Sequence, residues 1–520
     1  MSKRGWLMAG FWVGAALVAA GVTPGSARAQ GQTPGERDLQ HIIGQAGRGN
    51  GIITLYSGRD NSVPLTPGRQ TLNEALGEVY LTSPDLQAEQ AKLRATDEQV
   101  PTALSGWRPQ ISYQMQPGWG YGDLTSSQQI SGNPLLNIPT SVKAVTQSTE
   151  RWTFSQQLTV TQPVWRGGRT TAATAQAEGN VRAERANLIA QQEQSLANGM
   201  SAYVNAVQDQ QLYEINSDNV SLAQKTLDAT RLRFKLGEVT RTDVAQAEAG
   251  LAQAQNQLAT AYSQLQTALA TYRSEIGPVP QQLVAPQPLA MPARTEQQAE
   301  AVALANNAAI LNAAYADGAA KDAVNVAFAN LMPEFSLQGT AEYNNQPYNV
   351  GLIQRGGILG GMLQVPIYQG GSEYAAIRQA KQQEQEARKQ LDAARDNALQ
   401  LVAQYWQGTV QAREAAQAAS AAVRADEIAL DGVEREALAG TETTYDVLLA
   451  EQALLNARVT QVQNVDTLVT DSYQLAGAVG RLTVSDLGLK VPHYNPNAYY
   501  KAVRMLPFGT GDYATHQPGR

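Results

Sequence analysis

The sequence predicts a mainly α-helical protein that carries a pair of β-hairpins. Three observations lead to this fold class. Two helical segments are very long, short segments alternate apolar with polar residues, and an internal duplication repeats both features in the same order. Each copy is therefore expected to be one helix–hairpin–helix unit.

The composition of the 520-residue chain suits long helices better than a bulky globular core. Only 16% of the residues are charged and 6% are aromatic, and alanine and glutamine dominate long stretches. Small side chains allow helices to approach each other closely. The formal net charge of -7 argues against a nucleic-acid partner.

Residues 1–29 have the features of a secretory signal peptide. Lys3 and Arg4 form a basic start, Trp6–Val22 is apolar, and Ala27-Arg28-Ala29 is a small-x-small cleavage site. The alternative is a membrane anchor, for which the apolar run is short. After this segment no stretch is apolar enough for a transmembrane helix, and a chain without cysteine is not expected to be a lipoprotein.

The duplication is visible when the chain is aligned with itself. The string Pro163–Gly168 matches Pro366–Gly371, and Gly237 matches Gly440, both at an offset of 203 residues. Upstream of the first string the offset is 224, because the first copy has an insertion within Pro117–Arg151. That segment is rich in Gly, Ser, Asn and Pro, so it is expected to be an extended loop.

The repeat divides the chain into consecutive parts. After the signal peptide we expect a variable N-terminal segment (30–70), repeat one (71–280), a linker (281–295), repeat two (296–482) and a C-terminal tail (483–520). Within the repeats the hairpins are expected at about 108–165 and about 333–367.

Each copy has the same predicted order of helices. A first helix of about 35 residues (Thr71–Ser105; Glu296–Ala329) precedes the hairpin, a 68-residue helix (Arg169–Leu236; Ser372–Ala439) follows it, and a glycine turn leads to a last helix (Asp243–Ile276; Asp446–Val479). A 68-residue helix would be roughly 100 Å long, so it must pair along its length. The heptad-like spacing of Leu196, Met200, Tyr203 and Val207 supports such pairing.

The hairpin segments alternate clearly between apolar and polar residues. In Trp152–Val164, Phe154, Leu158 and Val160 share one face, and Ser155, Gln157 and Thr159 share the other. This pattern fits strands with lipid on one side and water on the other, and it also fits a soluble sheet with one buried face. The signal peptide and the lack of other core material favour the membrane.

Four strands cannot close a membrane barrel, because the smallest such barrels have eight strands. An open sheet edge in lipid would leave backbone groups unsatisfied. The chain is therefore expected to oligomerise. Two subunits would give eight strands, and three would give twelve and room for a lumen.

Several strings resemble the TolC family of outer-membrane efflux and secretion channels, over about Thr71–Leu489. They are Arg231–Val244, Gly440–Leu448, Val100–Pro109 and the Pro-x-x-x-Gly-Gly exits from the hairpins. The resemblance implies a homotrimer with one twelve-stranded β-barrel, four strands per chain, in outer-membrane lipid. The barrel would continue into a long periplasmic α-helical coiled-coil barrel, and the tail would be periplasmic.

The resemblance also implies partners and function. A periplasmic adaptor protein and an inner-membrane ABC or proton-driven pump would complete an export system in which this chain is a passive duct, with no cofactor and no enzymatic activity. The tail string Asn495–Arg504 resembles the branch that serves type I protein secretion, which we take as the first hypothesis. Small-molecule efflux is the alternative. A diffusion porin and a periplasmic coiled-coil structural protein fit less well.

The two glycine turns are the candidate adaptor-docking tips, with Gly237, Glu238 and Val239 in one copy and Gly440 and Thr441 in the other. The simpler interpretation of each glycine is a left-handed helix C-cap, and the two interpretations are compatible.

The candidate periplasmic gate follows the tips and consists of Arg241, Thr242, Asp243, Glu442 and Asp446. By resemblance, Thr242 and Asp243 would join links that hold the entrance shut, and three copies of Asp446 would form a negative ring. The structural alternative is that Thr240-x-x-Asp243 and Thr443-x-x-Asp446 are capping boxes. Family members often carry Arg where this chain has Glu442, so we hypothesise a charge-swapped pair between Arg241 and Glu442. The alternative is that both are solvated.

Aromatic residues lie near the predicted strand ends, where a membrane interface would place them: Trp107, Trp119, Trp152, Trp165 and Tyr368. The three histidines are scattered without the spacing of metal ligands, so no metal site is expected.

Overall fold

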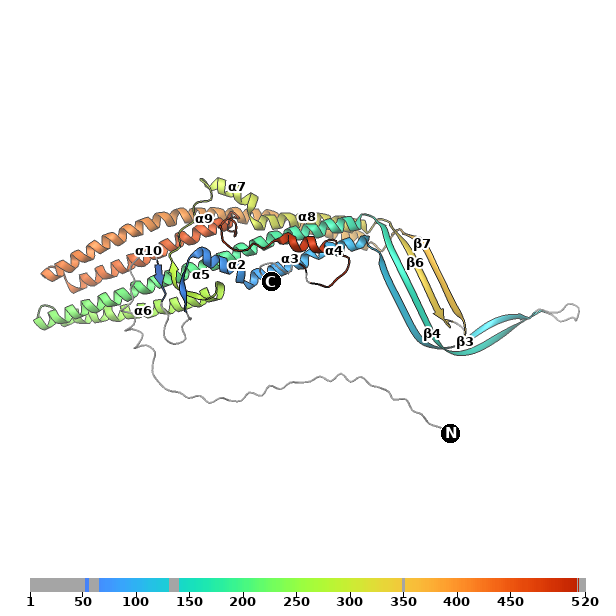
Figure 1. The fold of residues 1–520 in the computed structure, drawn as a ribbon. Helices are drawn as coiled ribbons and strands as arrows, with labels where there is room; N and C mark the ends of the chain where they lie inside the picture. The colour runs from blue at the N-terminus through green and yellow to red at the C-terminus, as the bar shows by residue number, and fades with distance from the viewer. Residues whose placement is uncertain (1–51, 56–64, 131–139, 348–350, 512, 514–520) are drawn as a thin grey trace, which may run out of the picture. The chain divides into compact units, whose positions relative to one another are not determined.

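The structure is a computed structural model that describes residues 52–55, 65–130, 140–347, 351–511 and 513. The predicted signal peptide and most of the segment 30–70 lie outside the described residues. Figure 1 shows helices of very different lengths lying side by side and a separate set of four strands. No helix in the described part of the chain is long and apolar enough to span a membrane.

The two longest helices are α5 (Arg169–Leu236) and α9 (Ser372–Ala439), with the bounds that the sequence predicts. Glycines in the left-handed region flank both, which explains why each helix begins and ends where it does. The helices that follow are α6 (Arg241–Glu275) and α10 (Thr444–Ala478), which begin two residues earlier than predicted because each N-cap is a threonine.

The prediction of one continuous helix before each hairpin is wrong. The first is divided into α2 (Leu72–Thr82), α3 (Pro84–Asp97), α4 (Gln99–Leu104) and a 3-10 turn. Ser83 caps α3 and Pro84 supplies no backbone N–H, so a new helix begins there. In repeat two, Asn307 separates α7 (Glu296–Asn306) from α8 (Ala308–Ala329), because its side-chain oxygen accepts hydrogen bonds from the backbone amides of Ala309 and Ile310.

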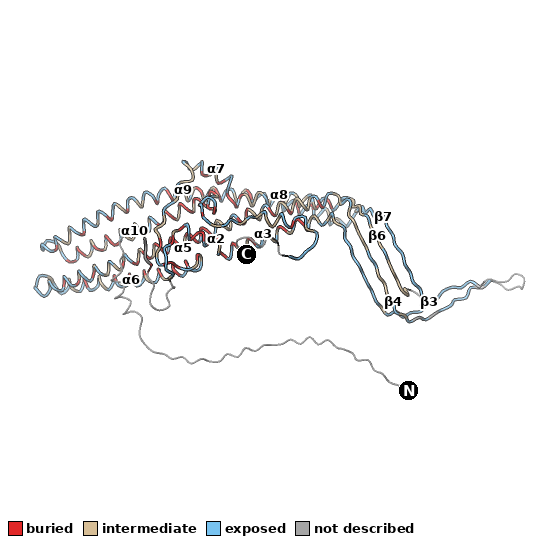
Figure 2. The backbone as a smooth tube through the Cα atoms, in the orientation of Figure 1, coloured by how far each residue is buried: buried red, intermediate tan, exposed pale blue. Residues whose placement is uncertain are grey.

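The long helices pair along their length with shorter ones. α5 contacts α6 near its C-terminal end and contacts α3 and α8 nearer its N-terminal end, while α9 contacts α8 and α10. The predicted heptad residues Leu196, Met200, Tyr203 and Val207 are all buried. Figure 2 shows that buried residues follow the helix–helix contacts, whereas the strands are mostly exposed or intermediate.

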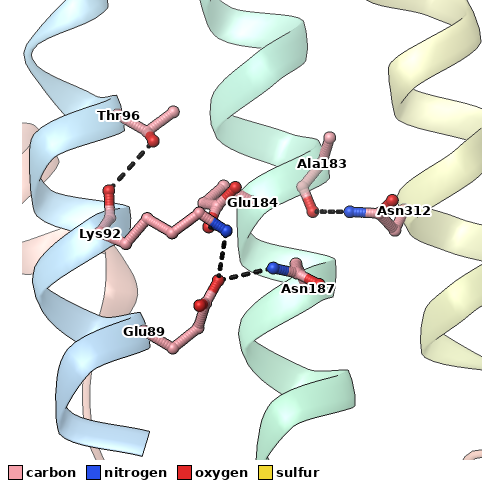
Figure 3. Close-up of polar contacts among 7 residues, drawn as sticks. All are labelled: Glu89, Lys92, Thr96, Ala183, Glu184, Asn187 and Asn312. Carbon is pink, nitrogen blue, oxygen red and sulfur yellow. Dashed lines mark hydrogen bonds and ion pairs between the residues drawn. The ribbon is translucent and has the colours of Figure 1, made fainter. Parts of the chain in front are cut away.

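A polar link joins three of these helices (Figure 3). Lys92 of α3 lies 3.1 Å from a carboxylate oxygen of Glu89 and 2.8 Å from one of Glu184 on α5. Asn187 donates to Glu89 at 2.6 Å, and Asn312 of α8 donates to the carbonyl of Ala183 at 2.8 Å. Burial and the neighbouring Glu89 raise the pKa of Glu184.

A small mixed sheet lies beside the middle of α5 and was not predicted. Its strands are β1 (Ile52–Thr54), β5 (Val279–Val284) and β2 (Leu65–Gln70), in that order. The Tyr203 hydroxyl lies 3.0 Å from the carbonyl oxygen of Gln70 and 2.7 Å from that of Val284, so it ties α5 to this sheet.

The second sheet contains β3 (Gln110–Ile130), β4 (Ser141–Arg166), β6 (Glu334–Asn345) and β7 (Ile353–Gln364), all antiparallel and in the order β3-β4-β6-β7. The loop predicted within Pro117–Arg151 is wrong for residues 117–130 and 141–151, because β3 and β4 pair residue by residue from Gln110↔Thr161 to Ile130↔Ser141. Residues 131–139 of that prediction lie outside the described residues. Hydrogen bonds between facing side chains, such as Thr125 with Thr146 at 2.8 Å, support this polar ladder.

The C-terminal tail crosses back over repeat one. Its helix α11 (Pro496–Val503) contacts α3, and the backbone amide of Tyr494 donates to the Tyr80 hydroxyl at 3.0 Å. Arg504 of the tail donates to Glu178 of α5 at 2.8 Å, and Arg108 donates to the carbonyl of Leu506 at 2.9 Å.

Candidate functional sites at the helical tips and the sheet

The turns after α5 and α9 have the same backbone geometry. Gly237 has φ 82° and Gly440 has φ 83°. The next residue's amide donates to the carbonyl five residues earlier, Glu238 to Arg233 and Thr441 to Glu436, each at 3.0 Å. These bonds form Schellman-type caps, so the C-cap interpretation of both glycines is confirmed. We call residues 237–240 the first tip and residues 440–443 the second tip.

Both capping boxes are also present. The Thr240 side chain accepts a hydrogen bond from the amide of Asp243, and the Asp243 carboxylate accepts one from the amide of Thr240 at 2.7 Å. Thr443 and Asp446 form the same reciprocal pair of hydrogen bonds. Hydrogen bonds from the threonine side chain and amide lower the pKa of each aspartate. Both carboxylates are therefore ionised at neutral pH and stabilise the first turn of their helix.

The two tips differ in charge. The first follows a helix end that carries Arg233 and Lys235, whereas the last turn of α9 carries no basic residue. Glu442 lies beside Asp446, which raises the pKa of Glu442. No ion pair joins Arg241 to Glu442 among the residues that the structure describes within one chain.

Exposed apolar residues surround both tips. On α5 and α9–α10 they are Leu232, Phe234, Leu236, Leu438, Tyr445 and Leu449.

The two helical hairpins, α5–α6 and α9–α10, touch mainly through α5 and α10, a contact that we call the hairpin seam. Thr226 of α5 donates to the carboxylate of Glu451 on α10 at 2.5 Å. Leu222 of α5 packs against the buried cluster that contains Leu430 and Leu454. Sequence analysis missed Glu451, because nothing in the sequence distinguishes it from the matching Glu248.

The four-stranded sheet has one mainly apolar and one mainly polar face, although Ile358 and Met362 of β7 lie on the polar face. Tyr113, Met115, Leu158 and Val160 share the first face with the β6 residues opposite them. The other face carries glutamine, serine and threonine at the alternate positions of β3 and β4. Both edges, β3 and β7, have no strand partner among the described residues of this chain.

The five predicted aromatics lie at two levels of the sheet. Trp119 and Trp152 pair across β3 and β4 with ring centroids 5.2 Å apart and an edge-to-face angle of 68°. Trp107, Trp165 and Tyr368 lie at the other end, where the strands meet the helices. All five side chains are exposed in the single chain.

No group of three or more His, Asp or Glu side chains suited to a metal ion occurs in the described part of the chain.

Comparison with known proteins agrees with this architecture. The family model described as "Outer membrane efflux protein" matches residues 75–277 and 301–481. The outer membrane efflux protein BepC of Brucella suis is 33% identical over 444 residues, covering 85% of this chain and 92% of BepC. The outer membrane protein TolC of Vibrio cholerae is 25% identical over 304 residues, covering 56% of this chain and 69% of TolC.

The solved structure of the outer membrane protein VceC from Vibrio cholerae has the same fold. It superposes with a TM-score of 0.64 at 19% identity, covering 79% of this chain and 96% of VceC. The fold is therefore that of TolC-like outer-membrane channels, and the protein is located in the outer membrane. The chain belongs to the outer membrane efflux protein family.

Proposed function

We propose that three copies of this chain form a passive duct across the outer membrane and that the duct is the outer component of a tripartite export system. The observation that carries the proposal is the four-stranded sheet with one apolar face and two unpaired edges. Unpaired edges cannot remain in lipid, and closure by neighbouring copies removes them. The expected absence of enzymatic activity belongs to the same proposal.

The two levels of aromatic residues fit the two interfaces of a membrane. Trp152 and Trp165 are thirteen positions apart on β4. At about 3.3 Å per residue and a tilt of about 40°, they are separated by roughly 30 Å along the membrane normal. This is the thickness of a hydrocarbon core, so these residues, with Trp107, Trp119 and Tyr368, would form the interfacial belts.

The tips would form the periplasmic entrance and the docking surface for an adaptor protein attached to an inner-membrane ABC or proton-driven pump. The exposed apolar side chains around Gly237 and Gly440 support a protein partner. Arg241 and Glu442 do not pair within one chain, so the gate pair would form between neighbouring subunits. A double-mutant cycle of Arg241→Gln and Glu442→Gln on channel conductance tests this, and purely additive effects would refute it.

The 33% identical relative is named an outer membrane efflux protein, which supports efflux as the first candidate function, and we take small molecules as its cargo. Type I protein secretion is the second candidate, because of the string Asn495–Arg504, which includes α11 and docks against α3 and α5. Deletion of the gene should sensitise cells to toxic small molecules in the first case, and should abolish appearance of a secreted protein in the medium in the second.

Membrane fractionation tests the proposed duct. The chain is expected in the outer-membrane fraction as a trimer that survives mild heating in detergent. A matched variant with charge on the apolar face, Leu158→Arg, should abolish the trimer, whereas Gln157→Arg on the polar face should retain it. A monomer in the soluble periplasmic fraction would contradict the proposal.

A further inference from the structure

The hairpin seam contains buried acidic side chains that face no cation. Glu451 is 5% exposed and Asp466 is 6% exposed, and both belong to the face of α10 that packs against neighbouring helices. The carboxylate of Glu451 accepts the Thr226 hydroxyl, and one carboxylate oxygen of Asp466 is buried without a hydrogen-bond partner. Ionised carboxylates in such places are costly unless a cation is near.

The groups around Glu451 are neutral or acidic. Glu434 of α9 is the charged group that acts on it, and it repels. α10 itself contributes Tyr445, and α6 faces the same region with Gln246 and Gln253. The nearest cations along α5 do not compensate Glu451. Lys225 is exposed to solvent, and Arg231 binds Glu248 of α6 at 2.7 Å.

The surroundings of Asp466 are similar. Asp209 of α5 is the charged group that acts on it, and it also repels. α9 presents its cation at this level, Arg413, to solvent, and α6 has no charged residue between Glu248 and Arg273. Within the described residues, no ion pair involves Glu451, Asp466 or Asp209.

The seam is also loosely packed near the tips. A partly open pocket of about 380 Å³ lies between α5, α6 and α10, and its lining includes Glu451 together with Ala223, Gly250 and Gln253. Water in this pocket would reach the buried carboxylate of Glu451 when the helices separate slightly.

The duplication makes the difference between the copies explicit. Glu451 matches Glu248, and Glu434 matches Arg231, both at the offset of 203 residues. The first copy therefore has an ion pair at 2.7 Å where the second has two acids. The second copy lacks the cation, and its acid is buried against α5.

We propose that Glu451 and Asp466 make the hairpin seam a proton-operated latch that positions α9–α10 against α5–α6. With the carboxyl groups protonated the seam is closed, and when they release their protons to water the seam loosens. This rests on the proposed function, because movement of one hairpin against the other changes the aperture at the tips. The latch makes the aperture of the periplasmic entrance depend on periplasmic pH.

The direction of the pH response follows from the burial of these groups. Burial, followed by the charge of Asp209, raises the pKa of Asp466 to about 7. Burial, and then Glu434, also raises the pKa of Glu451 despite the hydrogen bond from Thr226. The closed seam binds more protons than the open one, so closure is favoured at low pH and is lost as pH rises from the ordinary pKa toward the raised pKa. Each group can change the open-to-closed ratio by at most about tenfold per pH unit in that window.

Spin-label distance measurements on the full-length chain test the latch. The sequence has no cysteine, so Gln224→Cys on α5 and Asn456→Cys on α10, both at exposed positions, give one labelled pair across the seam. At about pH 5 we expect one short distance. At about pH 8 a longer component should dominate, because Asp466, whose pKa is raised to about 7, is then mostly ionised.

Matched variants distinguish the latch from a general effect of pH. Glu451→Gln with Asp466→Asn should keep the short distance at every pH, because the neutral amides mimic the protonated acids. Asp218→Asn, an exposed acid on α5, should respond like the unsubstituted chain. Glu442 at the second tip remains in all of these chains, so its titration cannot account for a difference between them.

An unchanged distance between about pH 5 and about pH 8 in the unsubstituted seam would overturn the latch. A pH response that persists in the Glu451→Gln, Asp466→Asn chain would overturn it as well. Failure of the duct itself gives a different result, namely a chain that forms no conducting channel in lipid at any pH. The distance measurement does not depend on conduction, so the two failures are distinguishable.

Discussion

Copy one and copy two place a glutamate at the same point of the helix that follows each tip, and the two side chains have opposite environments. Glu248 is half exposed and binds Arg231, whereas Glu451 is buried and binds the hydroxyl of Thr226. The backbones around them agree closely, down to the φ angles of Gly237 and Gly440. Duplication has thus kept the helix ends and capping boxes while the helix faces have changed to suit different neighbours.

The same lesson holds where each first helix meets its long helix. In copy one, Val79 of α2 packs on Gly199 of α5; in copy two, the matching residues are Ala303 of α7 and Val402 of α9, both fully buried. The valine lies on the short helix α2 in copy one and on the long helix α9 in copy two. The total volume in the contact is similar, so both contacts can be closely packed.

The largest expected effect comes from placing the valine of the long helix in copy two at the matching position of copy one, which is Gly199. In Gly199→Val the new Cβ would lie about 2.6 Å from the Val79 side chain, so the free energy of unfolding should fall by about 3 kcal/mol. Adding Val79→Ala recreates the arrangement of copy two and should restore most of the loss. Thermal unfolding followed by circular dichroism measures both. A double variant as unstable as the single one would show that the two contacts are not equivalent.

A smaller effect is expected from giving copy two the ion pair of copy one. Glu434→Arg places a cation near Glu451, so the pKa of Glu451 should fall and its carboxylate should become stable within the seam. The free energy of unfolding at neutral pH should rise by about 1 kcal/mol. The seam distance should also stay short at about pH 8. Glu434→Gln, which removes repulsion without adding a cation, is the control, and equal effects of Arg and Gln would argue against an ion pair.

The polar link around Lys92 exists only in copy one. The residues that match Glu89, Lys92 and Glu184 are Ala313, Ala316 and Ala387, at the same two offsets. Lys92→Met should therefore cost roughly 1 kcal/mol at neutral pH, since it leaves two carboxyl groups facing each other. Replacing all three residues by alanine should be closer to neutral. The cost of Lys92→Met should shrink as pH falls, because the raised pKa of Glu184 lets it protonate readily.

The smallest expected effect concerns the capping boxes, which both copies share. Thr240→Ala and Thr443→Ala each remove one helix cap and should each lower the free energy of unfolding by about 1 kcal/mol. Because the two capping boxes have the same geometry, the two costs should agree. Thr242→Ala, one position beyond an N1 residue, is the control and should be nearly neutral. A cost confined to one tip would mean that only that tip is stressed in the assembled protein.

The sequence predicts the long helices best, because their signals are local. Glycines next to Arg169, Leu236 and Ala439 end the helices in the left-handed region, and those positions are visible in the sequence. The register of β4 is equally local, since Phe154, Leu158 and Val160 alternate with polar residues.

Other features depend on contacts between distant segments. The sheet of β1, β5 and β2 joins residues more than 200 positions apart, and its short strands carry no distinctive pattern. The sequence beyond Pro117 predicts a loop because it is rich in glycine, serine, asparagine and proline, which are common turn residues, whereas the structure pairs much of it in a polar ladder. Glu451 and Asp466 were missed because an acidic residue on a helix is usually solvated, and only packing against α5 makes these two unusual.

The proposed duct is the central claim, and single-channel recording on the purified full-length chain in a planar lipid bilayer tests it most directly. We predict long-lived conductance steps from protein that migrates as a heat-resistant trimer, with conduction lost in Leu158→Arg and kept in Gln157→Arg. A folded chain that gives no conductance at any pH, or that conducts as a monomer, would contradict the claim.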